Sequence, residues 1–480
     1  MQPNLFSNRA QRGSARKGLL FLPRWPVRWS GVAELTCVLF GQATTAAGAL
    51  YGVRVLTEMI PPETFGQFML AMTAVTLAHQ VCFGPLGSAA QRFFGSARET
   101  DQFAVYGYVL VRMFIASAAV VFVATGLAAA GLRACQYATA ADLLWAAGSF
   151  AVVAGGASFL DAVHAAARWR LQVAWHQALT QCLRWTWAGY AAMAWAPTAS
   201  MALWGATLAV AAMTLVRLLT SGKLLGVPNR AVSHPTVDWS MHLWGYCWPL
   251  AAWGVFTWLG TVSDRWALAA FTAQCDVGQY AAVYQISYFP TVLLGEAVQQ
   301  FLAPILFSRM SVGTSAQHRY SALRWYSRAS LLTAVAFLIL CVMGACFARL
   351  IVRYAVAHAY QVPWDWFASL LVAGSLFALG QVLALAIMAA EGSAALLPAK
   401  VTSAVVTVVA NFCGAWMAGA RGVVLAMPLT AGVYVVWCVW LFARVTRTAA
   451  RQATLLPSQQ AREKSVQPES SDSSALRRAA

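Results

Sequence analysis

Long apolar stretches separated by short polar segments recur along most of the chain. A helix of about 20 apolar residues is long enough to cross a hydrocarbon core of about 30 Å. The connections between the stretches are short, so the pattern predicts an all-α integral membrane protein without a separate soluble domain. We predict twelve membrane-spanning helices, at residues 31–56, 66–90, 105–131, 142–166, 172–196, 200–220, 243–263, 279–303, 329–351, 366–390, 396–418 and 422–443.

One short sequence motif occurs twice along the chain. Arg54-Val-Leu is followed by Phe65-Gly-Gln-Phe, and Asp264-Arg265-Trp is followed by Val277-Gly-Gln-Tyr. The two arginines lie 211 residues apart, and six predicted helices separate the copies. An even number of helices gives both copies the same direction through the membrane, so the repeat is parallel. Such a duplication is typical of transporters, whose two halves rock about a shared site.

The repeat predicts two six-helix bundles, at residues 31–222 and 243–443. Residues 1–30 form a basic arm, and residues 223–242 link the bundles. Residues 444–480 are rich in Ser, Gln and Arg, so we expect a disordered tail.

Composition supports a membrane protein. Hydrophobic residues make up 60% of the chain and charged residues only 10%, whereas about a quarter of a soluble protein is charged. Of the 33 Lys and Arg residues, 25 fall on segments that face one side, among them Arg217 and Lys400. This asymmetry is the positive-inside signal and predicts that both termini are cytoplasmic. The net charge of +17 therefore indicates topology and attraction to anionic membrane lipids, and not a nucleic-acid partner.

The sequence offers little for an enzyme. It contains no phosphate-binding glycine loop, no paired-cysteine metal spacing and no Gly-x-Ser-x-Gly elbow, so we expect no cofactor, no metal and no catalytic residue. Asp161 and His164 lie three residues apart on one predicted helix and could form a general acid–base pair. We favour an ordinary polar contact near the cytoplasmic end of this helix.

A polar stripe runs along the predicted helix 172–196. Gln177, Thr180, Gln181 and Arg184 recur at the i, i+3, i+4 and i+7 positions of one helical face. Arg184 lies near the middle of the membrane, too deep to reach either surface easily. Because a charged side chain at this depth usually faces a cavity or the bundle interior, we favour a cavity-lining role over a purely structural one.

Two charged residues occupy neighbouring predicted helices in their cytoplasmic halves. Arg112 and Asp161 could form a buried ion pair that opens when substrate or a proton arrives. Alternatively, the Arg112 side chain extends to the cytoplasmic surface without a partner.

The predicted helix 279–303 carries a broad polar arc. Tyr284, Tyr288 and Gln299 offer hydrogen-bond donors and acceptors that suit sugar hydroxyls, although the same groups also join helices. Glu296 is the one acid well within the predicted helices of the second half, so it is a candidate proton or counter-ion site.

Several short motifs, in their order and spacing, resemble the Wzx-type polysaccharide flippases, which share a superfamily with MATE multidrug exporters and lipid II flippases. The resemblance extends over about residues 31–443. The matching stretches are Tyr51 to Phe68, Gly87 to Phe93, Ala165 to Arg170, Val262 to Tyr280, Met388 to Gly392 with Asn411 beyond, and Gly419 to Ala426.

The resemblance implies a V-shaped, MATE-like pair of bundles around a central cavity. It also implies a flippase that moves undecaprenyl-pyrophosphate-linked oligosaccharides to the outer leaflet of a bacterial inner membrane. Such a flippase serves exopolysaccharide, capsule or O-antigen synthesis, beside a polysaccharide polymerase and chain-length machinery. Arg54 and Arg265 match the arginines expected on the first and seventh helices, and with Asp264 they are candidates for a gate or helix-end anchor. Arg112 and Arg184 would suit pyrophosphate or acidic sugars.

Two other functions compete with this interpretation. A proton- or sodium-coupled small-molecule antiporter of the MATE type would use Asp161, Glu296 or Glu34 for coupling. A membrane-embedded polysaccharide polymerase or ligase would be expected to carry a large outer loop, and the outer loops of this chain are short.

Overall fold

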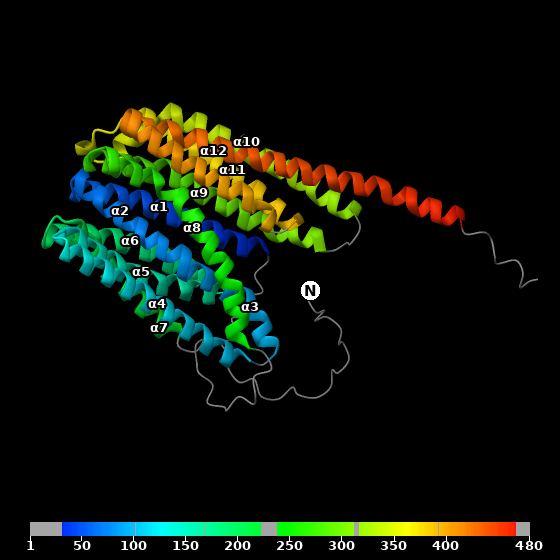
Figure 1. Ribbon diagram of the computed structural model, residues 1–480, viewed down its shortest axis with the longest axis horizontal. Helices are drawn as coiled ribbons and strands as arrows, with labels where there is room; N and C mark the ends of the chain where they lie inside the picture. The colour runs from blue at the N-terminus through cyan, green and yellow to red at the C-terminus, as the bar shows by residue number, and fades with distance from the viewer. Residues whose placement is uncertain are drawn as a thin grey trace, which may run out of the picture.

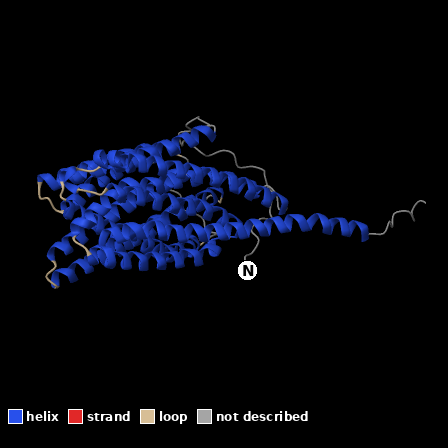
Figure 2. Ribbon diagram, turned by 90° about the horizontal axis from the view of Figure 1, so that it is seen from above, coloured by secondary structure: helices blue, strands red, loops and turns tan. Residues whose placement is uncertain are grey.

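The computed structural model describes residues 31–100, 102–167, 169–221, 238–311, 316–391 and 393–466. Within these ranges the chain is helical with short connections and no strand (Figure 2). The predicted arm and most of the predicted linker lie outside the described residues. In chain order the helices are α1 (Gly31–Met59), α2 (Pro62–Ala78), the π-helix η1 (His79–Phe83), α3 (Gly84–Glu99), α4 (Phe103–Ala134), α5 (Ala138–Ala166), α6 (Arg170–Ala194), α7 (Ala199–Ser221), α8 (Trp239–Phe271), α9 (Gln274–Ser311), α10 (Ala316–Ala355), the 3-10 helix η2 (His358–Tyr360), α11 (Trp364–Glu391), the 3-10 helix η3 (Ser393–Leu396) and α12 (Leu397–Val466).

These helices supply the twelve predicted spans. The segments α2, η1 and α3 form one continuous span, and α12 supplies two. Eight helices of the described chain are long and apolar enough to cross a membrane by themselves. Helices α1, α6 and α8 are not among them; α1 and α6 pack mainly on each other, and α8 packs mainly on α12.

A sharp turn divides α12 into two limbs between the predicted spans 396–418 and 422–443. Gly419 has a φ of +57°, in the left-handed region that favours glycine. Beyond the turn, a Cβ atom on Gly422 would lie 1.9 Å from the Gly414 carbonyl oxygen. The two limbs therefore approach as closely as backbones allow, and glycine is required on both.

The helices form two bundles with the same internal pairing. In the first, α1 packs on α6, α2 on α5, and α4 on α5; in the second, α8 packs on α12, α9 on α11, and α10 on α11. Figure 1 shows the second bundle above the first, with α8 crossing obliquely from one toward the other. The parallel duplication seen in the motifs is therefore a duplication of helix packing.

The two copies of the glycine motif touch each other across the bundles. A Cβ atom on Gly66 would lie 2.6 Å from the Gln274 carbonyl oxygen, and one on Gly278 would lie 1.9 Å from that of Pro62. This contact joins α2 to α9 at what we call the outer end, which the charge pattern places away from the basic connections. At the opposite, inner end, α3 packs against α8.

The C-terminal limb of α12 is longer than the sequence predicts. It continues beyond residue 443 to Val466, as a single rod that projects from the second bundle (Figures 1 and 2). The prediction of a disordered tail was therefore wrong for residues 444–466, where Ala, Arg and Gln, which are good helix formers, extend a helix that the bundle has already nucleated. Residues 467–480 lie outside the described residues.

We predict that Gly278→Ala lowers the free energy of unfolding by about 1–3 kcal/mol, because the added methyl group has no room against the Pro62 carbonyl. Thermal unfolding of the purified protein in detergent measures this effect. Gly432→Ala is the matched control, since a Cβ atom there meets nothing within 4 Å. Equal unfolding temperatures for the two variants would contradict the importance of the contact.

Candidate functional site

At the outer end, a set of polar bonds joins the first bundle to the connection between α10 and α11. Arg54 donates from Nη1 to the Val356 carbonyl at 3.1 Å and also pairs with Glu58, one turn further along α1. The Ala357 backbone N–H donates to Thr57 Oγ1 at 3.2 Å. Arg54 therefore lies where the two halves meet, and its side chain is 36% exposed.

Tyr360 completes this outer contact. Its hydroxyl donates to the Ile60 carbonyl at 3.0 Å, and its ring packs edge-on against Phe65 with centroids 5.9 Å apart. Burial raises the pKa of the Tyr360 hydroxyl, which stays protonated and available as a donor. We call Arg54, Thr57, Tyr360 and their bonded partners the outer contact.

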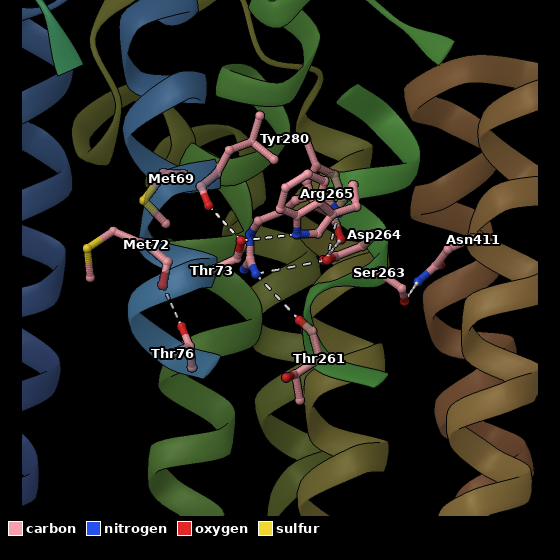
Figure 3. Close-up of polar contacts among 12 residues, drawn as sticks. Met69, Met72, Thr73, Thr76, Thr261, Ser263, Asp264, Arg265, Tyr280 and Asn411 are labelled. Carbon is pink, nitrogen blue, oxygen red and sulfur yellow. Dashed lines mark hydrogen bonds and ion pairs between the residues drawn. The ribbon is translucent and has the colours of Figure 1, made fainter. Parts of the chain in front are cut away.

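In the second bundle, α8 and α9 enclose a charged cluster (Figure 3). Asp264 accepts a hydrogen bond from the Tyr280 hydroxyl at 2.7 Å. It also forms an ion pair with Arg265, in which Arg265 Nη1 lies 3.9 Å from Asp264 Oδ1. The Arg265 guanidinium lies over the Tyr284 ring, 4.2 Å from its centroid. Both charged residues are buried, so they neutralise each other in the bundle interior.

This cluster is tied to the first bundle through Thr73 of α2. Trp266 donates its indole N–H to the Thr73 hydroxyl at 3.0 Å, and Trp258 donates to the Thr73 carbonyl at 2.7 Å. On the other side of α8, Asn411 donates to Ser263 at 2.9 Å. Thr73 thus accepts hydrogen bonds from two tryptophans of the opposite bundle. A single Thr in an apolar helix gives no sign of this role in the sequence.

The two repeat arginines have different surroundings, although their motifs match. Arg265 is buried beside Asp264, whereas Arg54 is preceded by Val53 and reaches the surface. The acid that precedes only the second arginine explains the difference, because a buried arginine needs a counter-charge. The halves are duplicates in packing but not in electrostatics.

Within the first bundle, Asp161 is paired with Arg217 and not with Arg112. Arg217 Nη1 lies 2.7 Å from Asp161 Oδ1, and Gln177 donates to the other carboxylate oxygen at 3.3 Å. Arg217 also donates to the Ala157 carbonyl at 3.1 Å. The suggested pair with Arg112 is wrong, because Asp161 lies on the face of α5 that packs against α6 and α7.

Arg217 could have been found from the sequence. It lies within the predicted span 200–220, yet we assigned it to the cytoplasmic loop that follows. In the structure its side chain is almost fully buried, with 2% exposure. His164, the other half of the suggested acid–base pair, places Nδ1 2.7 Å from the Leu160 carbonyl one turn earlier, which is an ordinary helical contact.

Arg184 lies on the polar stripe of α6 as predicted from the spacing. It donates to Gln181 Oε1 at 2.6 Å, and its guanidinium stacks over the Trp185 ring at 4.5 Å. Helix α1 makes room for the stripe with Gly48 and Gly52, since a Cβ atom on Gly52 would lie 2.2 Å from the Trp185 ring. Arg184 has no acidic partner among the described residues, so none of them neutralises its charge.

Arg112 lies apart from this stripe, on an exposed face of α4. It lines a groove of about 460 Å³ between α4, the η1–α3 segment and α8, whose walls include Met113, Trp244 and Trp248. The groove is largely apolar, and Arg112 makes no ion pair in the described part of the chain.

Some side chains of the predicted polar arc of α9 are buried and others are exposed. Tyr284 and Tyr288 are buried and stacked, with ring centroids 4.6 Å apart. Gln299 donates to the Gly295 carbonyl of its own helix at 3.4 Å. Glu296 is exposed and forms no ion pair within the described ranges, so it is the acid of this arc that is free to meet a ligand or ion.

The arrangement of helices matches several solved membrane transporters. A lipid II flippase, MurJ, in an inward closed conformation aligns with a TM-score of 0.63 at 10% identity, over 89% of this chain and 93% of that one. A MATE transporter of Vibrio cholerae, VcmN, aligns at 0.62 with 13% identity, over 86% and 96%. An inward-facing multidrug resistance MATE transporter of the MOP superfamily aligns at 0.61 with 12% identity, over 86% and 98%.

The chain has the fold of these flippases and transporters. No protein-family profile and no curated protein sequence matches it. The two-bundle membrane architecture predicted from the sequence is thereby confirmed, and at such low identity the likeness concerns the fold.

We predict that Arg217→Met destabilises the protein by about 3–5 kcal/mol, because it leaves the Asp161 carboxylate buried without its counter-charge. Thermal unfolding in detergent provides the measurement. The double variant Asp161→Asn with Arg217→Met should regain most of the loss, since neither charge is then left alone. A double variant as unstable as the single one would show that Arg217 acts through packing only.

Proposed function

We propose that this protein is a flippase that moves an undecaprenyl-pyrophosphate-linked oligosaccharide from the inner to the outer leaflet of a bacterial inner membrane. The fold it shares with a lipid II flippase supports a lipid-linked substrate. In this proposal the protein is not an enzyme, and the chain serves as a passage between the leaflets for exopolysaccharide, capsule or O-antigen units.

The balance of buried charge carries this proposal. Asp161 and Asp264 are each neutralised by an arginine of the same bundle, whereas Arg184 has only neutral partners among the described residues. The interior therefore has an excess of positive charge, which suits an anionic cargo such as a pyrophosphate and opposes a cationic drug. Gln177 and Gln181 beside Arg184 add donors and acceptors of the kind that sugars require.

The transport cycle would be alternating access. The outer contact holds the two bundles together around Arg54, Thr57 and Tyr360, so it must break for release to the outer leaflet. Asp264 and Arg265 form a buried pair on α8, and the next residue, Trp266, bonds Thr73 of the opposite bundle. We therefore assign these residues to the outward gate, and Tyr284 and Tyr288 to the packing behind it.

The orientation and partners belong to the same proposal. Both termini would be cytoplasmic, as the basic connections predict. A polysaccharide polymerase and chain-length machinery would receive the flipped units. Arg112 would contact the cargo or a lipid only from the groove beside α8.

A coupled antiporter of the MATE type is the second candidate, and Glu296 is the observation that favours it. This acid forms no ion pair with any described residue. A lone acid within a membrane-spanning helix is typical of proton and ion relays. Glu296 could equally couple flipping to an ion gradient.

We predict that Arg184→Gln reduces glycan export at least about tenfold while leaving the amount of folded protein unchanged, because it removes the charge that binds the pyrophosphate. Export and the lipid-linked intermediates that accumulate in the cells are measured together. Arg184→Lys should retain more activity than Arg184→Gln.

The exposed Arg353 at the outer end of α10 offers a matched control, since Arg353→Gln removes one charge without touching any assigned site. Normal export by the Arg184→Gln variant would overturn the role of Arg184 in binding the cargo.

Locking the outer contact tests the transport cycle. We predict that a crosslink between Thr57→Cys and Ala357→Cys blocks export and that reduction restores it. The two positions are in contact, since the Ala357 backbone N–H donates to Thr57 Oγ1 at 3.2 Å. Either single cysteine variant alone should export normally under the same oxidant. Undiminished export by fully crosslinked protein would exclude an outward gate at this place.

A further inference from the structure

The second bundle contains a cavity, lined in part by polar side chains, that the proposed transport path does not use. Its volume is about 60 Å³, and it lies between α8, α9, α11 and the two limbs of α12. Lys400, Ser403 and Thr407 line it from the first limb, and Thr430 and Tyr434 line it from the second. The cavity therefore combines one cation with several hydroxyl groups.

The first-limb residues repeat the polar stripe of the first bundle. The spacing of Lys400, Ser403 and Thr407 equals that of Gln177, Thr180 and Arg184. Each set begins at the same distance after a related helix junction, which starts at Met388 for the first set and at Ala165 for the second. In the first bundle, Gln177 meets the acid Asp161 of α5. In the second bundle the described residues around the cavity include no acid, so Lys400 stands in this stripe without a counter-charge.

The Lys400 ammonium contacts aromatic rings instead. Its Nζ lies 4.6 Å from the Tyr434 ring centroid and 5.7 Å from that of Phe377. Cation–π contacts contribute about 0.5–2 kcal/mol, but they do not neutralise a charge. The next cation, Arg265, is separated from the cavity by the stacked pair Tyr284 and Tyr288, and is already paired with Asp264.

Most hydroxyl protons of the cavity already have acceptors. The hydroxyls of Thr407 and Thr430 donate to carbonyls of their own helix, at 2.7 and 3.0 Å. The Tyr434 hydroxyl donates to Gln381 at 3.3 Å. The Ser403 hydroxyl is buried and has no partner among the described residues, so it is left with the three N–H groups of Lys400.

We propose that this cavity binds one small inorganic anion of the size of chloride, held by Lys400 and Ser403. A water molecule could accept hydrogen bonds here, but only an anion also supplies the missing counter-charge. A cavity of about 60 Å³ has room for a small ion. The cavity lies in the second bundle and is not lined by Arg184, so this ligand is distinct from the proposed cargo.

The bound anion would stabilise the second bundle. It would join Lys400 and Ser403 of the first limb, and the Lys400 ammonium in turn contacts the rings of Tyr434 on the second limb and Phe377 on α11. Because a ligand that binds only the folded state raises stability with its concentration, the unfolding temperature should depend on chloride.

Chloride titration of the purified full-length protein in detergent tests the proposal, with gluconate replacing chloride at constant ionic strength and pH. The unfolding temperature of the native protein should rise with chloride and saturate. Lys400→Met should lower the chloride affinity at least about tenfold, because it removes a charge-assisted hydrogen bond. Ser403→Ala should lower it less, since a neutral donor contributes less than a charged one.

Arg353→Gln serves as the control for the loss of one positive charge, and its chloride response should equal that of the native protein. Bromide is the second probe, and crystals of the native protein grown in bromide should show anomalous density beside Lys400 Nζ. An unfolding temperature independent of chloride, or an equal response in Lys400→Met, would overturn the proposal. Anomalous density elsewhere but absent from this cavity would do the same.

Discussion

The close approach of Gly66 and Gly278 is the contact on which the arrangement of the two bundles depends. Without side chains, the start of α2 and the start of α9 meet backbone to backbone at the outer end. This approach brings the end of α1 within hydrogen-bonding reach of the connection after α10, where Thr57, Ala357 and Tyr360 bond. A bulkier pair at the glycine positions would separate all of these groups.

Behind this contact, the cost of burying charge in a membrane protein organises the interior. Asp161 and Asp264 each have an arginine within the same bundle, so neither acid is left alone. Arg184 and Lys400 lie on matching faces of α6 and α12 without an acid among the described residues. Arg184 is suited to a large anionic cargo, and Lys400 to a small ion.

The candidate site was partly predictable. The i, i+3, i+4, i+7 spacing placed Gln181 and Arg184 together on α6, because helical geometry alone decides which side chains share a face. The partner of Asp161 was not predictable in this way. Arg217 reaches it from α7 with a long side chain, and only the crossing of α5 and α7 decides that distance.

The sequence by itself determined the membrane-spanning helices and the duplication, because apolar length and short motifs are local properties of the chain. The bias of Lys and Arg predicts the orientation in the same way. It also placed the turn inside α12, where Gly419 adopts a left-handed backbone. Only the tertiary structure decided which charges neutralise each other, that Arg54 and Arg265 differ in burial, and that Lys400 lines a cavity. These outcomes depend on how helices far apart in the sequence cross, and no local pattern encodes that geometry.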